Sequence, residues 1–302
     1  MKINITKYKI YIISKLNFII KYLIGNQLYM RIVFTLVLYN NSYEEIQPLI
    51  ESINKLNLEY KKYKDIILSI NDNSNKFSLE NQIKENLNKN IIFYYTKNKN
   101  IGFGKGHNCA FKASRISSNL NQEDILIVVN PDVYFLPKEI GRMIDFINQK
   151  ENKKIVCIAP LIFNEKKIIQ YSAKQNPTIL SLLISRIKPL ERIGILKKYI
   201  SKNQNRSKTL SSIFESEYLS GCFLLIRAIS FSEINGFDET YFLHFEDADL
   251  TRTLSKLGKC IHYPYSQIIH RWNRGSHKSF RQTILLIQSM INYFRKWGLK
   301  LF

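Results

Sequence analysis

The chain has 302 residues, of which 45% are hydrophobic and 13% aromatic, and its formal net charge is +21 at pH 7. This much apolar material can fill the core of one α/β domain and excludes a wholly disordered chain. The charge is concentrated in residues 1–30, 174–210 and 271–302, which carry +5, +8 and +7. Such segregation favours either nucleic acid or an anionic lipid surface as a partner.

The cysteine spacing indicates the redox state of the compartment, and the length of the apolar runs indicates whether the chain could span a membrane. The cysteines lie far apart without metal-finger spacing, so we expect reduced, mostly buried thiols in a reducing compartment. No apolar run reaches the roughly 18–20 residues of a spanning helix, since residues 10–24 are interrupted by Lys15 and Lys21. Residues 1–29 are expected to be a basic extension, either a membrane-surface anchor or a stretch upstream of the true start.

From residue 31 onward, strand-like and helix-like segments alternate. Apolar runs typical of buried parallel strands occupy residues 32–38, 66–70, 91–95 and 125–129. Helical spacing of apolar residues follows in residues 43–58, 78–88 and 106–118. The alternation predicts an α/β fold with a mostly parallel central sheet and helices on both faces.

Beyond Asp132 the pattern becomes less regular. Further strands are expected at residues 155–159 and 223–226, and helical segments at residues 178–200, 247–257 and 280–297. The last of these helices is basic and amphipathic. We therefore expect one domain, residues 30–279, followed by a basic amphipathic helix in residues 280–302.

Three of the predicted strands end in similar polar residues: Tyr39-Asn40, Asp72-Asn73 and Asn130-Pro131-Asp132. Ligands of open α/β sheets bind outside the carboxyl ends of the strands. Turns after strands favour Asn and Asp in any case. A single such turn is more often structural, but three in one sheet favour a binding site.

A glycine-rich stretch runs from Asn100 to Asn108 and includes Gly102, Gly104 and Gly106. Closely spaced glycines let backbone N–H groups approach a phosphate, and the start of a helix attracts anions. The spacing does not match a Walker A loop or G-x-G-x-x-G. A phosphate-binding loop and a plain tight turn are equally compatible with it.

Three carboxylates, Glu246, Asp247 and Asp249, follow the bulky run 241–245 and open a predicted helix. Acids in the first turn stabilise a helix. The preceding aromatic residues predict a partly buried cleft, which raises a carboxylate pKa toward use as a general base. Asp132 could hold a divalent cation against a diphosphate, although a turn that ends the strand is the better interpretation of this residue in isolation. His270, after a short apolar run, could face a metal or a diphosphate, although a lone histidine is usually structural.

These motifs together, over residues 31–297, resemble glycosyltransferase family 2, and within it the rhamnosyltransferase-like enzymes of bacterial surface polysaccharide synthesis. The resemblance rests on the three polar strand ends, the Asn100–Asn108 stretch and the late His270. It also rests on Ser220-Gly221-Cys222-Phe223, Gly236-Phe237-Asp238-Glu239 and Phe245-Glu246-Asp247-Ala248-Asp249-Leu250.

The resemblance implies a GT-A fold, a divalent cation (Mg²⁺ or Mn²⁺) and inversion at the anomeric carbon. It implies that Asp247 is the catalytic base, that Glu246 and Asp249 orient or polarise the site, and that Asp72 contacts the base or ribose. Asp132 would bind the metal and diphosphate, with His270 as a further metal or phosphate contact. The expected donor-binding residues are Tyr39, Asn40, Asp72, Gly102, Gly104, Gly106, Asn108, Asn130 and Asp132.

The family commonly has Asp-x-Asp at the metal site, whereas Asn130 replaces the first acid here. The Asn-Pro-Asp form is that of the rhamnosyltransferase-like members, which makes dTDP-rhamnose the leading donor, and the missing carboxylate predicts weaker metal binding. A UDP-hexose or UDP-galactofuranose is the alternative donor. The resemblance implies a lipid-linked saccharide acceptor at the inner, cytoplasmic face of a bacterial membrane, where the basic stretches would dock a peripheral enzyme. A basic face that is only solvated is the alternative.

Two functions of other classes remain as alternatives. A non-catalytic protein could use its basic face for a membrane or for nucleic acid, although the basic stretches are rich in Leu and Ile rather than in stacking aromatics, and no nucleic-acid motif is present. We therefore expect no nucleic-acid partner. A catalytically inactive family member acting as a scaffold is the other alternative, and the intact Asp132 and Asp247 argue against it.

Overall fold

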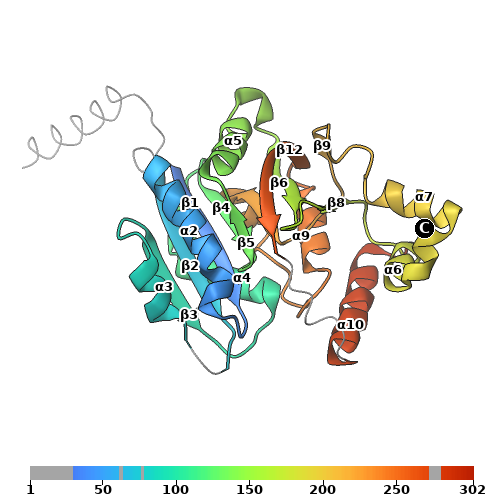
Figure 1. The fold of residues 1–302 in the computed structure, drawn as a ribbon, viewed down its shortest axis with the longest axis horizontal. Coiled ribbons are helices and arrows are strands. Elements are labelled where there is room, and N and C mark those ends of the chain that lie inside the picture. The colour runs from blue at the N-terminus through green and yellow to red at the C-terminus, as the bar shows by residue number, and fades with distance from the viewer. Residues whose placement is uncertain (1–29, 61–63, 76–77, 272–279) are drawn as a thin grey trace, which may run out of the picture.

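The computed structural model describes residues 30–60, 64–75, 78–271 and 280–302 (Figure 1). The predictions for residues 1–29 lie outside this range. The strands are β1 (Met30–Leu38), β2 (Lys64–Asp72), β3 (Ile92–Lys97), β4 (Ile125–Val129), β5 (Val133–Phe135), β6 (Ile155–Phe163), β7 (Ile169–Gln170), β8 (Ala173–Lys174), β9 (Phe214–Glu215), β10 (Tyr218–Leu219), β11 (Phe223–Arg227) and β12 (Lys259–His270). The helices are α2 (Tyr43–Tyr60), α3 (Glu80–Asn86), α4 (Phe103–Ala113), α5 (Pro137–Ile147), α6 (Ile179–Arg186), α7 (Gly194–Asn203), α8 (Ala228–Glu233), α9 (Glu246–Leu254) and α10 (Phe280–Trp297).

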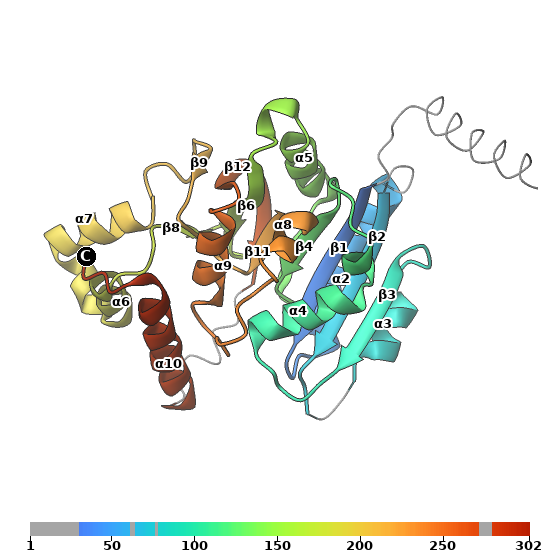
Figure 2. The same cartoon turned by 180° about the vertical axis from the view of Figure 1, so that it is seen from behind.

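The central sheet has the strand order β3-β2-β1-β4-β11-β6-β12-β5. The first four strands are parallel, as the alternation of apolar runs predicts. β11 then runs antiparallel between β4 and β6, and β12 is parallel to β6. Helices α2 and α5 cover one face, and α4, α8 and α9 cover the other (Figures 1 and 2). The expected α/β fold with helices on both faces is confirmed.

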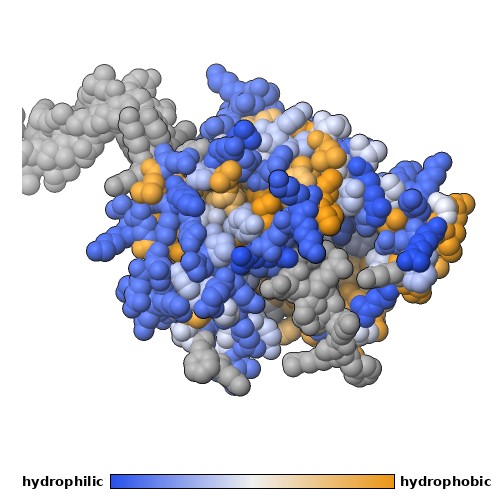
Figure 3. Space-filling model, in the orientation of Figure 1, coloured by the Kyte–Doolittle hydropathy of each residue, from blue (hydrophilic) through white to orange (hydrophobic). Residues whose placement is uncertain are grey.

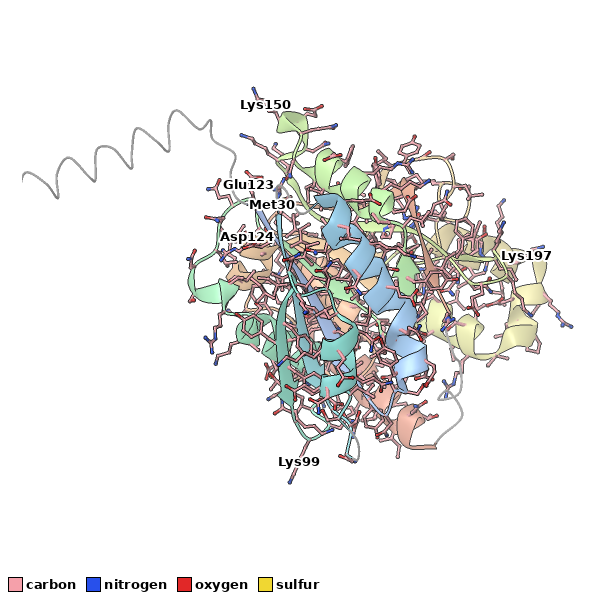
Figure 4. All side chains as sticks on the ribbon, turned by 60° about the vertical axis from the view of Figure 1, so that its left-hand side comes forward. Met30, Lys99, Glu123, Asp124, Lys150 and Lys197 are labelled. Atoms are coloured by element: carbon pink, nitrogen blue, oxygen red, sulfur yellow. The ribbon has the colours of Figure 1, made fainter. Side chains whose placement is uncertain are left out.

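The carboxyl ends of the parallel strands share one edge of the sheet. Met30 begins β1 close to Glu123 and Asp124, which precede β4, whereas Lys99, just after β3, lies at the opposite end of the molecule (Figure 4). The polar residues that follow β1, β2 and β4 therefore gather at the Lys99 end. This arrangement satisfies the geometric condition for the predicted ligand crevice.

Two boundaries differ from those expected from the sequence. The helix expected from residue 106 begins at Phe103, so two glycines of the supposed loop are helical. The single amphipathic region of residues 178–200 is divided into α6 and α7. Pro189, which lies between them in a short 3₁₀ turn, lacks the N–H group that a continuous helix requires.

Helices α6, α7 and α10 gather at one end of the molecule (Figure 1). α10 is attached there by a small apolar cluster, in which its Tyr293 packs with Tyr241 and Phe245. The chain end also pairs with the start of α6, where the N–H of Ile179 donates to the carbonyl of Lys300. Within the described residues, no helix combines the length and the apolar character that crossing a bilayer requires.

All four cysteines are free thiols, as expected. Three of them are buried, and Cys109 is partly exposed. The three buried cysteines belong to hydrophobic clusters. Among the described residues no cluster of His, Cys, Asp and Glu forms a ready metal site.

Asp124 is predicted to be a main determinant of stability at the amino-terminal edge of the sheet. It is fully buried, and it accepts hydrogen bonds from the backbone N–H of Arg31 (3.0 Å), from Nε of Arg31 (3.1 Å) and from the N–H of Asn121 (2.8 Å). Asp124→Ala leaves these donors unpaired and should lower the free energy of unfolding by about 3–5 kcal/mol. Urea denaturation measures the loss, with exposed Asp145→Asn as a control expected within about 0.5 kcal/mol of wild type. An equal effect of the two substitutions would contradict this role.

Candidate active site

A cavity of about 710 Å³, here called the sheet-edge cavity, lies at the carboxyl ends of the strands. Five predicted donor-binding residues line it: Tyr39, Asn40, Gly102, Asn130 and Asp132. The opposite wall comes from the loop before α9 and from α10. Residues from six separate stretches of sequence are thus brought to one site.

Backbone conformation shapes two parts of this cavity. Asn40 has a positive φ of 55°, and its N–H donates to Oγ of Ser74 (2.7 Å), which ties the end of β1 to the turn after β2. Gly102 has a φ of 92°, and a Cβ there would lie 2.4 Å from the carbonyl oxygen of Phe242. Only glycine fits such a close approach at this backbone conformation.

Three other residues of the glycine-rich stretch do not border any of the cavities described here. A Cβ on Gly104 would lie 2.8 Å from Cβ of Phe237, and a Cβ on Gly106 would lie 2.7 Å from Cγ2 of Val37. Asn108 donates from Nδ2 to the carbonyl of Phe237 (2.9 Å) and accepts from the N–H of that residue (2.9 Å). Close packing of α4 therefore accounts for these residues.

Asp72 is buried beneath the cavity. Its Oδ2 accepts from the hydroxyl of Tyr95 (2.7 Å) and from Nζ of Lys97 (2.8 Å), and its Oδ1 accepts from the N–H of Ser74 (2.8 Å). Burial by itself would raise the pKa of Asp72, but hydrogen bonds from Lys97, Ser74 and Tyr95 outweigh it and lower the pKa. The next residue, Asn73, lines the cavity instead.

Asp132 and His270 form a polar pair where β4 and β12 end. Nε2 of His270 lies 3.2 Å from Oδ1 of Asp132, and Nδ1 of His270 lies 2.9 Å from Oε1 of Gln170. Burial lowers the pKa of His270, but the Cys222 sulfur and the Asp132 carboxylate oppose it and raise the pKa to about 10. The imidazole is therefore a cation that donates to Asp132.

The oxygen atoms around Asp132 suit a hard divalent cation. Asp132 supplies a carboxylate whose side chain is 19% exposed, and the neighbouring Asn130 has a buried Oδ1 without a hydrogen-bond partner. Mg²⁺ and Mn²⁺ are commonly held by one or two protein oxygens, with water and substrate phosphates completing the shell. His270 would have to lose its proton to become a ligand, so its predicted metal contact stays a prediction.

A second cavity of about 820 Å³, here called the central cavity, adjoins the first. Asn130, Phe103 and Leu243 line both. The central cavity is also bordered by His270, Glu246 and Asp247. A ligand that extends from one cavity into the other would pass from Asp132 toward Asp247.

Asp247 is held firmly at the start of α9. Its Oδ2 accepts from the N–H of Gly221 (3.0 Å) and from the hydroxyl of Tyr218 (3.1 Å), while Oδ1 accepts from the N–H of Ala248 (2.9 Å). Cβ of Asp247 would lie only 3.1 Å from a Cβ on Gly221, so this glycine allows the carboxylate to sit close to the chain. A carboxylate with this support is oriented for proton abstraction.

Glu246 has a different environment from its neighbour. It is buried, and its Oε2 has no hydrogen-bond partner among the described residues. Burial, together with the negative charge of Asp247, raises the pKa of Glu246 to about 8. Glu246 is therefore mainly protonated at neutral pH and leaves a single negative charge at this point.

Asp249 points away from both cavities and binds α10. Its Oδ1 accepts from Nε1 of Trp297 (2.6 Å) and from the hydroxyl of Tyr241 (3.3 Å), and its Oδ2 lies 2.9 Å from Nζ of Lys296. The side chain is 2% exposed. These contacts give Asp249 a structural explanation, in contrast to the expected role of orienting the site.

Sequence reasoning missed several groups that support the site. Gly221 belongs to the Ser-Gly-Cys-Phe motif that carries the resemblance, so that motif could have indicated it. Gln170, Lys174 and Tyr218 lie in two-residue strands or beside them. Segments this short have no periodicity, so no pattern in the sequence marks these three residues.

The sheet topology is that of a GT-A glycosyltransferase fold, and the two cavities with Asp132 and Asp247 lie where such a fold binds its substrates. Two solved structures share this fold: GalNAc-T7 with UDP, GalNAc and Mn²⁺ has a TM-score of 0.57 at 16% identity, covering 90% of this chain and 48% of that one. Mannosyltransferase PcManGT from Pyrobaculum calidifontis, in complex with GDP-Man and Mn²⁺, has a TM-score of 0.51 at 11% identity, covering 89% and 66%. At these identities the likeness concerns the fold.

Residues 35–230 match the model of glycosyl transferase family 2, and the chain belongs to this family. It is 25% identical to rhamnosyltransferase WbbL of Escherichia coli (strain K12) over 79% of this chain and 83% of that protein. It is 27% identical to an N-acetylglucosaminyl-diphospho-decaprenol L-rhamnosyltransferase of Mycobacterium tuberculosis (strain CDC 1551 / Oshkosh) over 49% of this chain and 47% of that protein. The chain is thus a glycosyltransferase similar to rhamnosyltransferases, as the motifs indicate.

The raised pKa of Glu246 predicts a pH-dependent stability difference. Between the ordinary value of 4.5 and about 8, folded wild type holds a proton that the unfolded chain has lost, so its stability falls as the pH rises. Glu246→Gln has no proton to lose, so its melting temperature relative to wild type should rise by at least about 4 °C between pH 4.5 and pH 8.5. Exposed Glu151→Gln should show no such trend in calorimetry. A constant difference for Glu246→Gln across this range would contradict a neutral Glu246.

Proposed function

We propose that this protein is an inverting rhamnosyltransferase that moves rhamnose from dTDP-rhamnose to a lipid-linked saccharide of a bacterial surface polysaccharide. The observation that carries the proposal is the pair of adjoining cavities, one containing Asp132 and the other containing Asp247. The similarity to rhamnosyltransferases supports the choice of sugar. The diphospho-decaprenol named for the mycobacterial relative supports the choice of a lipid-linked acceptor.

The donor binds in the sheet-edge cavity in this proposal. Tyr39, Asn40 and Asn73 line its nucleoside side, and Asp132 lies at the boundary with the central cavity. A divalent cation bound at Asp132 would supply neutralising charge to the diphosphate. His270 holds the Asp132 carboxylate in place and adds a positive charge next to it.

The acceptor hydroxyl binds beside Asp247, which takes its proton as the new C–O bond forms. Gly221 and Tyr218 keep the carboxylate in position during the attack, and neutral Glu246 avoids a second negative charge there. A single displacement requires one base and no covalent intermediate, so the anomeric configuration is inverted.

Asp247→Asn tests the assignment of the base. Removal of the base should lower kcat for sugar transfer by about 10²–10⁴-fold while donor KM changes little, because Asp247 borders the acceptor side. Purified protein is incubated with dTDP-rhamnose, UDP-glucose, UDP-galactose, UDP-galactofuranose and UDP-N-acetylglucosamine in turn, with Mg²⁺ or Mn²⁺ and membrane extract as acceptor. Release of nucleoside diphosphate is measured, and exposed Asp145→Asn is the control.

The donor that supports turnover identifies the sugar. Turnover with a UDP-sugar alone would replace rhamnose by that sugar and leave the mechanism intact. Full activity of Asp247→Asn would refute the assigned base. A wild-type protein that binds none of these nucleotides would refute the proposed function.

The end of the molecule formed by α6 and α7 supports a peripheral position on an anionic membrane. Large apolar side chains are exposed there between basic ones, and Figure 3 shows hydrophobic and hydrophilic surface side by side at this end. We call this set the amphipathic face: Leu183, Arg186, Ile187, Arg192, Ile193, Ile195, Lys197, Lys198, Lys202, Lys208 and Leu210. Apolar side chains can enter the interface while the cations contact lipid phosphates.

A third cavity, of about 260 Å³, lies between α6, α7, α10 and the start of α9, which carries the candidate base. It is lined by Leu182 of α6, Ile200 of α7, Leu286 of α10 and Asp247. We call it the helical cavity. A lipid-linked acceptor that approaches from the amphipathic face could extend its saccharide through this cavity to Asp247.

Loss of three lysines on the amphipathic face tests the membrane position. Each basic residue contributes about 1 kcal/mol at an anionic surface, so the triple change Lys197→Gln, Lys198→Gln and Lys202→Gln should weaken vesicle binding by about 100-fold. Co-sedimentation with phosphatidylglycerol-containing vesicles measures the effect. The control removes Lys150, Lys153 and Lys154 in the same way; Lys150 and Lys197 extend from different ends of the molecule (Figure 4). Equal losses in both triple variants would argue against a specific face.

A further inference from the structure

Lys174 has a charge for which the structure gives no partner. It ends β8 and is the direct cross-strand neighbour of Tyr218 in β10. Its Nζ lies 5.3 Å from the centre of the Tyr218 ring, but the ammonium group forms no hydrogen bond or ion pair with any residue that the structure describes. Lys174 is partly exposed and lines two cavities, so its ammonium group is open to a ligand. An unpaired cation in this position favours the binding of an anion.

The position of Lys174 indicates which substrate brings the anion. It lines both the central cavity and the helical cavity, as do Gln204, Glu246 and Asp247. It does not line the sheet-edge cavity, where Asp132 lies. A group that contacts Lys174 can therefore reach it through the helical cavity, on the side of α6 and α7, without entering the sheet-edge cavity.

Lys174 is also not a simple counter-ion of the candidate base. Oδ2 of Asp247 is occupied by Gly221 and Tyr218, and no ion pair joins Lys174 to Asp247. Burial lowers the pKa of Lys174, and the negative charge of Asp247 opposes this effect from a distance. Tyr218 contacts both residues, since its hydroxyl binds Asp247 and its ring faces Lys174.

We propose that Lys174 binds the diphosphate of the acceptor and thereby places the acceptor hydroxyl beside Asp247; this inference rests on the proposed function. In a sugar linked through its anomeric carbon to a diphosphate, the hydroxyl and the phosphate belong to the same ring. The protein side chains that bind this hydroxyl and this phosphate must therefore border the same cavity, as Asp247 and Lys174 do. An ammonium group is a suitable ligand for phosphate oxygens because it donates charge-assisted hydrogen bonds.

The test compares two acceptors that differ only in the diphosphate. One is N-acetylglucosaminyl diphosphate esterified to a short alkyl chain, and the other is the same sugar as an octyl glycoside. In Lys174→Met, KM for the diphosphate acceptor should rise by about 10–100-fold through loss of a charged hydrogen bond. The kinetic constants for the octyl glycoside and donor KM should stay within about twofold of wild type. Lys174→Arg should recover most of the affinity, and exposed Lys150→Met is the charge-matched control.

Three other outcomes would overturn the proposal. An equal loss on both acceptors would mean that Lys174 acts on Asp247 or on the fold, and a raised donor KM would mean that it contacts the donor. Unchanged kinetics would mean that it contacts neither. If wild type transferred sugar to neither acceptor, the proposed function would fail, and calorimetric binding of the alkyl diphosphate acceptor to wild type and Lys174→Met would still decide the role of Lys174.

Discussion

The pairing of β11 with β4 is the contact on which both halves of the site depend. Phe223 is in register with Val129, and beyond this pair the N–H of Asn130 donates to the carbonyl of Cys222 (2.9 Å). This hydrogen bond places the Asn130–Asp132 turn next to the segment that contains Gly221. The N–H of Gly221 donates to Asp247. A shift of this register by one residue would turn every side chain of β11 to the other face and separate the two carboxylates.

Three acids at the start of α9 show how burial and neighbours assign different properties to similar residues. Asp247 receives backbone and hydroxyl donors and borders a cavity, whereas Glu246 is buried without a partner for Oε2 and has a raised pKa. Asp249, two residues after Asp247, accepts hydrogen bonds from Trp297 and Lys296 of α10. Successive residues of a helix point in different directions. One short motif therefore places Asp247 at a cavity, Glu246 in the protein interior and Asp249 against α10.

The sequence was informative where a local pattern has a direct physical meaning. Runs of β-branched and apolar residues predicted β1 to β4, and polar strand ends predicted the sheet-edge cavity that Asn40 and Asp132 line. It was less informative about the glycines, because a glycine that allows close packing and one that approaches a phosphate look the same in a sequence. Gly104 and Gly106 pack against Phe237 and Val37, and only Gly102 borders the cavity.

The sequence by itself determined the family, the α/β architecture and the identity of Asp132 and Asp247 as candidate site residues, because these follow from periodicity and from short ordered motifs. Tertiary structure alone decided which charges meet. The pairing of His270 with Asp132 and Gln170, the enclosure of Asp72, and the position of Lys174 beside Tyr218 depend on strands that pair across long separations. Such contacts arise from sheet order and register, which local spacing does not encode.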